Sequence, residues 1–226
     1  MENQAEKIEY SLKRGLRKTI LLRVTPDCKV EVLAPRRTSE AFIEGFVQSK
    51  RDWILKSIAA KEDIIKKRAA YHMETLAFLG VEYPIKTYHG QDMMFDGGCF
   101  RLPRCAVTEQ KMLIKQWYKR EGKEIFIKRV QHWAEKMDAQ YSAVKVTEAR
   151  TRWGSCSGQN SLNFSWRLLF AAGKVVDYVV IHELAHTKVH AHSPEFWEIV
   201  AEYCPDYESC QRELKELSSK LAVWDW

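Results

Sequence analysis

Two histidines four residues apart, in a mostly apolar stretch, constrain this chain more than any other feature. The segment His182-Glu183-Leu184-Ala185-His186 follows a run rich in valine and isoleucine, which predicts a largely buried helix over residues 174–190. Helix positions four apart project from one face, so both imidazoles can reach one metal ion. Glu183 lies about 100° around the helix from His182 and can reach a water molecule on that ion.

The third ligand can come from either of two downstream histidines. On a continuing helix, His182, His186 and His190 would span about 12 Å of helix axis, which is too long for one tetrahedral ion. Ser193-Pro194 instead form a favourable cap and first residue of a new helix, which would hold the backbone at His192. We therefore expect His182, His186 and His192 to be the ligands. Three carboxylates are the alternatives: Glu195, Glu198 and Glu202.

These residues together predict a hydrolytic metal site. Nitrogen ligands and a reaction without a redox step favour Zn²⁺, and one ion is expected. Three neutral imidazoles leave the ion its double positive charge, which lowers the pKa of a bound water toward about 7. Glu183 is placed to take the proton from this water and pass it to the leaving amine of a peptide bond. We therefore expect a zinc-dependent metallopeptidase with Glu183 as its catalytic residue.

Composition agrees with an enzyme that folds without disulfides. Of the 226 residues, 46% are hydrophobic, which suffices for a substantial core. The six cysteines are scattered without C-x-x-C spacing, so they do not compete with the histidines as a zinc site. The sequence has neither a signal-peptide core at its start nor an apolar run long enough to cross a membrane. A cytoplasmic protein with reduced thiols and no membrane partner is expected.

Positive charge is concentrated in the N-terminal third of the chain. Residues 1–70 hold 16 Lys and Arg against 10 Asp and Glu, whereas the rest holds 20 of each. Solvated helix faces are the simpler interpretation of this excess. The alternative is a docking surface for nucleic acid or a protein partner, formed by Arg36-Arg37, Lys50-Arg51 and Lys66-Lys67-Arg68.

The residue pattern predicts an α+β chain with two regions. In the first, residues 1–105, three alternating runs at 8–13, 19–25 and 29–34 predict a small antiparallel meander, followed by a helix from Thr38 or Ser39 to about Arg68 and short strands over 76–103. The second, residues 106–226, is the expected metallopeptidase core. Its predicted elements are a helix over 108–141, strands over 144–147 and 161–169, the metal-binding helix, and two helices that begin at Pro194 and about Tyr207.

Four ordered segments carry a family resemblance. They are Arg152-Trp153-Gly154-Ser155-Cys156, the segment 162–168 (LNFSWRL), the segment 177–186 (DYVVIHELAH) and His192-Ser193-Pro194-Glu195-Phe196-Trp197. Together they resemble the YgjP-like metallopeptidase family, as do the N-terminal segments 30–35 and 46–53. The resemblance implies a zincin-like core, in which the active-site helix packs on a small mixed sheet, with zinc on the two helix histidines and the histidine before Ser-Pro. The family is similar in motif to SprT/Spartan-like and WLM proteases, which act on DNA–protein crosslinks or modified proteins, and its members occur beside restriction–modification systems.

The segment upstream of the helix is a candidate for substrate binding. Residues 161–168 could form a strand along the helix that offers backbone groups to an extended substrate, with Gly154 permitting a tight entry turn. Arg152 could stabilise an oxyanion or hold a carboxylate, and Asn163 and Arg167 are assigned to the same substrate-binding region. Structural ion pairs are an equal alternative for the two arginines. Cys156 could be a fourth zinc ligand, although a buried structural thiol is favoured.

Three other functions compete with a peptidase that acts on protein or peptide. A zinc hydrolase of a non-peptide bond, such as a nucleotide pyrophosphatase, could use the same ion and Glu183. However, the sequence has no Gly-rich phosphate loop and no carboxylate cluster for Mg²⁺. A binding module with structural zinc would be expected to have four ligands rich in cysteine. A DNA-associated protease linked to repair or restriction systems would use the basic N-terminal third for docking.

Overall fold

The computed structural model describes residues 8–70 and 73–224, without the side chains of residues 67–70, and has mixed α+β structure as predicted. The chain forms two compact units, Met1–Tyr71 and His72–Trp226. This boundary lies earlier than the predicted one after residue 105. The reason is packing, because Leu76, Phe100 and Leu102 belong to the hydrophobic core of the second unit.

The first unit combines a three-stranded sheet with two helices. Its elements are β1 (Ser11–Gly15), β2 (Leu21–Val24), β3 (Val30–Pro35), α1 (Glu40–Ser49) and α2 (Arg51–Ala70). The sheet order is β1-β3-β2, with β1 parallel and β2 antiparallel to β3, so the predicted meander is wrong in its order. Strand β3 takes the centre because it buries Val30, Val32 and Ala34 on one face.

The predicted helix of the first unit begins as expected and then breaks. The Ser39 hydroxyl accepts a hydrogen bond from the Phe42 amide and caps α1. Lys50 separates α1 from α2, since its amide bonds back to the Val47 carbonyl while its own carbonyl accepts from Ile54. Ile43, Val47 and Ile54 pack with the buried residues of β3 into one small core.

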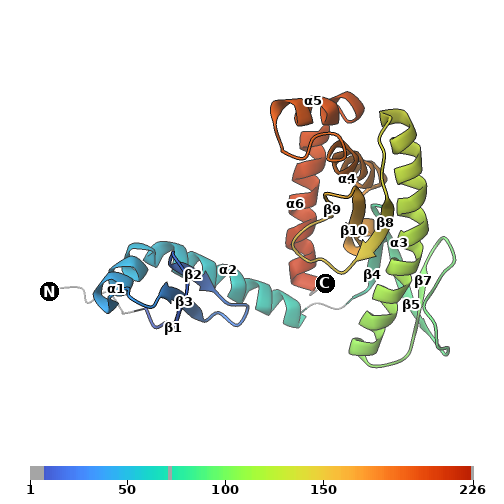
Figure 1. The fold of residues 1–226 in the computed structure, drawn as a ribbon. Helices are drawn as coiled ribbons and strands as arrows, with labels where there is room; N and C mark the ends of the chain where they lie inside the picture. The colour runs from blue at the N-terminus through green and yellow to red at the C-terminus, as the bar shows by residue number, and fades with distance from the viewer. Residues whose placement is uncertain (1–7, 71–72, 225–226) are drawn as a thin grey trace. The chain divides into compact units, whose positions relative to one another are not determined.

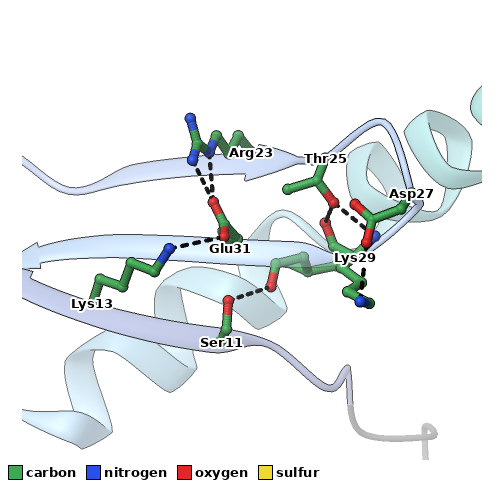
Figure 2. Close-up of polar contacts among 8 residues, drawn as sticks. Ser11, Lys13, Arg23, Thr25, Asp27, Lys29 and Glu31 are labelled. Atoms are coloured by element: carbon green, nitrogen blue, oxygen red, sulfur yellow. Dashed lines mark hydrogen bonds and ion pairs between the residues drawn. The ribbon is translucent and has the colours of Figure 1, made fainter.

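Paired charges cover the open face of this sheet (Figure 2). Glu31 on β3 binds Lys13 on β1 and Arg23 on β2, so one carboxylate serves two cations. Arg36, Arg37 and Lys50 are exposed, whereas the side chains of Lys67 and Arg68 lie outside the described residues. A docking role for this basic unit stays a prediction.

The second unit begins with a four-stranded sheet and a long helix. Its first elements are β4 (Thr75–Phe78), β5 (Val81–Tyr88), β6 (Met94–Phe95), β7 (Phe100–Pro103) and α3 (Val107–Met137), with sheet order β4-β5-β7-β6. The α3 helix ends at Asp138, which adopts a left-handed conformation with φ 47°. The Tyr118 hydroxyl donates to the Ala77 carbonyl at 2.6 Å and ties α3 to β4.

The remaining elements are the helix that carries the two-histidine motif and the strands and helices near it (Figure 1). They are β8 (Ala143–Thr147), β9 (Gly154–Cys156), β10 (Ser161–Ser165), η1 (Trp166–Phe170), α4 (Gly173–Ala185), α5 (Pro194–Tyr203) and α6 (Tyr207–Trp224). In the mixed sheet β8-β10-β9, β8 is parallel and β9 antiparallel to β10. The α4 helix contacts α3, α5, α6 and β9, which confirms the expected helix on a small mixed sheet. None of the helices in the described part of the chain is both long and apolar enough to span a membrane.

A tight hairpin turn positions the β4–β5 pair against the start of α4. Phe78 pairs with Val81, so the turn consists of Leu79 and Gly80, and both have positive φ, 51° and 84°. This is the backbone that two-residue hairpins favour. A Cβ atom on Gly80 would lie 2.6 Å from the Cα of Ala172, the residue that precedes α4. Glycine is therefore required at position 80 both by the positive φ and by the close approach of Ala172.

We predict that Gly80→Ala destabilises the protein by about 2 kcal/mol or more. Left-handed backbone costs a non-glycine residue about 1–2 kcal/mol, and the contact with Ala172 adds strain. Chemical denaturation monitored by circular dichroism measures the change. Gly158→Ala is the control because a Cβ there meets nothing within 4 Å. Equal stability of the two variants would contradict the argument.

Candidate metal centre

The α4 helix ends earlier than predicted, at Ala185, and His186 lies in the turn that follows. The Thr187 hydroxyl donates to the Leu184 carbonyl at 2.7 Å, and the Lys188 ammonium group donates to the Met137 carbonyl. These side chains occupy carbonyl groups at the ends of α4 and α3, and the chain then leaves the helix direction. His190 consequently does not continue the row of His182 and His186.

Three imidazole nitrogens converge at the end of α4. The Nε2 atom of His192 lies 3.2 Å from the Nε2 atoms of both His182 and His186. Ligand nitrogens about 2.0–2.1 Å from a tetrahedral zinc ion are separated by roughly 3.3 Å. The observed separations match that value, so this ligand set fits one small ion with tetrahedral coordination.

The tautomer of His186 is set by its backbone contact. Its Nδ1 atom lies 3.2 Å from the Val189 carbonyl oxygen, which only accepts, so Nδ1 carries the proton. The Nε2 atom of His186 therefore presents a lone pair toward His192. A single N–H group on His192 cannot serve two facing nitrogens at once, whereas a cation accepts lone pairs from all three. Metal-binding histidines usually donate their second ring N–H group to a carbonyl or carboxylate oxygen, and the Val189 carbonyl accepts from His186 in this way.

Burial keeps the two helix histidines in the neutral form that binds metals. Burial, together with the charges of His186 and His192, lowers the pKa of His182 to about 3. Burial also lowers the pKa of His186, although its contact with Val189 opposes the shift. The Nδ1 atom of His182 has no hydrogen-bond partner within the described chain, so ring packing orients this side chain.

Two aromatic side chains of α5 supply that packing. The buried Phe196 ring stacks on His186 with centroids 4.4 Å apart and meets the edges of His182 and His192 at 4.9 and 4.8 Å. Trp197 lies nearly parallel to His192 at 5.8 Å. Neither side chain is among the ligands or substrate-binding residues predicted from the sequence. Their position immediately after His192-Ser193-Pro194-Glu195 is the signal that could have indicated a role at the site.

The cap of α5 holds His192 in place as expected. The Ser193 hydroxyl accepts from the Phe196 amide at 3.5 Å, and Pro194 occupies the first turn. His190 is exposed and lies outside the three-histidine cluster, and so do the three alternative carboxylates, Glu195, Glu198 and Glu202. The geometry thus favours His192 as the third ligand.

Glu183 is a buried carboxylate that packs against the backbone of β9. Its side chain is 5% exposed, and burial raises its pKa to about 7, against the opposing effects of the Cys156 amide and the Arg152 charge. A Cβ atom on Gly154 would lie 2.5 Å from the Glu183 Oε1 atom. Gly154 is therefore needed because Glu183 occupies the space of a side chain, and not for the entry turn that the sequence suggested.

The strand beside Glu183 is β9, whereas the residue pattern predicts a substrate-binding strand at residues 161–168. Strand β10 lies between β8 and β9, so its backbone is paired on both sides. The Ser165 amide donates to Trp153 and the Ser157 amide donates to Ser161. By the alternation of antiparallel pairing, the Gly154 backbone and the Cys156 carbonyl are directed to the free edge of β9, whereas the Cys156 amide faces Glu183.

The other predicted substrate residues occupy different positions around the site. Arg152 is exposed and close enough to Glu183 to lower its pKa. The Asn163 amide group donates within the sheet, to Ser155 and Ser161.

Arg167 is buried, and its guanidinium group donates to the Glu148 carbonyl at 3.0 Å and lies over the Trp166 ring. These bonds favour structural roles for Asn163 and Arg167. Cys156 is half-buried, and its thiol lies 3.5 Å from the Ser157 carbonyl oxygen, outside the histidine cluster.

We predict that His192→Ala lowers the bound Zn²⁺ by one equivalent per chain, because two ligands hold zinc much less tightly than three. His190→Ala should retain the full amount, since this exposed side chain is outside the cluster. Atomic emission analysis after dialysis against a weak chelator measures both. Loss of zinc in His190→Ala, with retention in His192→Ala, would reverse the ligand assignment.

Comparison with known proteins agrees with this geometry. Residues 18–217 match the model of the family described as "YgjP-like, metallopeptidase domain". Searches of curated proteins and of solved structures found no match. The family match covers most of the chain and includes the three histidines and Glu183. The chain therefore belongs to the YgjP-like family of metallopeptidase domains.

Proposed function

We propose that this YgjP-like protein is a zinc-dependent peptidase that binds one catalytic Zn²⁺ through His182, His186 and His192 and uses Glu183 as general base. The proposal rests on three Nε2 atoms that converge next to a buried carboxylate. The Nε2 atom of His192 lies 3.2 Å from the Nε2 atoms of His182 and His186. Family membership supplies the reaction class. The donor set supplies the metal, because all-nitrogen ligands with tetrahedral spacing suit zinc.

The metal and Glu183 contribute to different steps of amide hydrolysis. When bound, zinc supplies Lewis acidity, which polarises the scissile carbonyl and makes water easier to deprotonate. Glu183 accepts a proton from water as the water oxygen bonds to the carbonyl carbon. The carbon–nitrogen bond then breaks, and Glu183 returns the proton to the departing amine. The low exposure of Glu183 keeps bulk water from competing for this proton.

The free edge of β9 is the proposed binding site for an extended peptide. The Gly154 backbone and the Cys156 carbonyl are directed to this edge, whereas the Cys156 amide faces Glu183, and Gly154 lies directly on the Glu183 carboxylate. A peptide added as a further strand would bring its carbonyl groups past Glu183. Arg152, exposed beside the same edge, is suited to hold a substrate carboxylate or a developing oxyanion.

We predict that Glu183→Gln lowers peptide hydrolysis by roughly 10²–10⁴-fold, the usual contribution of a general base. Zinc content should not change, because the three ligands stay in place. Cleavage of a peptide library, followed by mass spectrometry with and without chelator, measures activity. Glu195→Gln is the matched control, since Glu195 is exposed on α5 and lies outside the cluster.

Nucleoside triphosphates added to parallel reactions test the competing hydrolase. Chelator-sensitive phosphate release that disappears in Glu183→Gln, in the absence of any peptide cleavage, would replace the peptidase proposal. Full peptide cleavage by Glu183→Gln would remove Glu183 from the role of base.

We also predict that Gly154→Ala lowers peptide hydrolysis on the order of 10–100-fold with unchanged zinc content. The new methyl group would displace the Glu183 carboxylate, and an error of about 1 Å in a catalytic group can cost 10²-fold. The zinc ligands lie on α4 and the following loop, away from this contact. Gly158→Ala, in open space after β9, should keep wild-type activity. Equal activity of the two variants would contradict the positioning role of Gly154.

A further inference from the structure

A second group of metal-binding side chains lies where α5 meets α6. Cys204 follows the last residue of α5, Asp206 precedes the first residue of α6, and Cys210 lies in the first turn of α6. The ligand atoms of all three lie within 4.8 Å of one another. The cluster shares no residue with the three histidines.

The backbone of the junction brings these side chains together. The Cys204 amide donates to the Val200 carbonyl at 2.8 Å, which closes the end of α5. The Asp206 carbonyl accepts from Ser209 at 2.9 Å and from Cys210 at 3.4 Å, which starts α6. Cys204 and Cys210 are 8% and 0% exposed, whereas Asp206 faces solvent. The two thiols are therefore buried, and the carboxylate lies on the solvent-exposed side of the cluster.

The spacing between the Cys204 and Asp206 ligand atoms suits a tetrahedral ion. The Cys204 Sγ atom lies 3.7 Å from the Asp206 Oδ1 atom. For zinc with sulfur at about 2.3 Å and oxygen at about 2.0–2.2 Å, tetrahedral geometry places such a pair about 3.6 Å apart. Because Asp206 is exposed, water can supply the fourth ligand.

We propose that Cys204, Asp206 and Cys210 form a second metal site, which binds a thiophilic divalent cation, most readily Zn²⁺. Thiolate sulfur selects zinc or cadmium over magnesium and calcium. Binding releases the two thiol protons to solvent, so two thiolates and one carboxylate meet a double positive charge and the site has a net charge of −1. Lys174, which pairs with Glu213 at 2.5 Å, lies within electrostatic range of Cys210 and Asp206 and offsets this charge.

A metal at this junction would hold the aromatic wall of the histidine site. Trp197 on α5 stacks on Tyr207 on α6, with centroids 5.1 Å apart. The same tryptophan lies against His192. An ion that joins the end of α5 to the start of α6 would therefore hold Trp197 against both Tyr207 and His192. The role of the second ion is structural, and it does not depend on the proposed peptidase function.

Cadmium titration of the full-length, reduced, metal-free protein tests the proposal, because thiolate-to-cadmium charge transfer absorbs in the ultraviolet and imidazole ligands give no such band. We expect a band that saturates at one equivalent in the wild type. It should disappear in Cys204→Ser/Cys210→Ser and persist in His182→Ala/His186→Ala. Total zinc should be two equivalents in the wild type and one in each double variant.

Two further variants guard against misfolding and unspecific thiol binding. Asp206→Asn keeps both buried thiols and should weaken cadmium binding at least about tenfold, because it removes a charged ligand. Cys28→Ser/Cys105→Ser removes two half-buried thiols elsewhere and should leave the band unchanged. Absence of the band in the wild type, its persistence in Cys204→Ser/Cys210→Ser, or a Cys204–Cys210 disulfide found by mass spectrometry in the native protein would overturn the second site. None of these outcomes would affect the histidine site.

Discussion

The contact between the Glu183 carboxylate and the backbone of Gly154 joins α4 to its sheet, and the positions of the neighbouring strand and glycine depend on it. A buried carboxylate is costly unless polar groups face it, and here the Cys156 amide does so. The strand that provides this amide must therefore pass close to the helix. It can do so only where a side chain is missing, because Glu183 fills the space where a Cβ atom of Gly154 would lie. The edge strand β9, Gly154 and the Glu183 carboxylate form one packing unit.

The opposite side of the site depends on aromatic packing. Phe196 touches all three histidine rings, and Trp197 extends this wall to Tyr207 on α6. The three histidines therefore pack against the apolar side of α5, whereas the neighbouring Glu183 packs against β9. Burial lowers the pKa of His182 and of His186 and so keeps these two imidazoles neutral, which favours metal binding at neutral pH. The proposed second metal site would brace the α5–α6 junction that presents this wall.

Sequence reasoning succeeded where local chemistry decides the outcome. The spacing of His182 and His186, the Ser193-Pro194 cap and the exclusion of His190 all depend on a few neighbouring residues, and the structure has the three histidines at contact distance. It failed where distant segments compete. The α4 helix stops at Ala185, and Lys188 beyond it donates to the end of α3, whereas the buried strand β3 takes the central position that the expected meander order would have given to β2. Similarly, Leu76, Phe100 and Leu102 belong to the core of the second unit, although the sequence pattern predicted that they are part of the N-terminal region.

The amino-acid sequence by itself determined the family and marked three histidines and Glu183 as the candidate ligands and base, since these follow from residue identity and short spacing. Only the tertiary structure decided which strand faces Glu183, because β9 and β10 are both short and the pairing order depends on long-range contacts. It also decided that Gly154 leaves room for a carboxylate and that Arg167 is committed to backbone carbonyls. Cys204, Asp206 and Cys210 carry no recognised spacing. They became a candidate site only because the junction of two helices folds them onto one point.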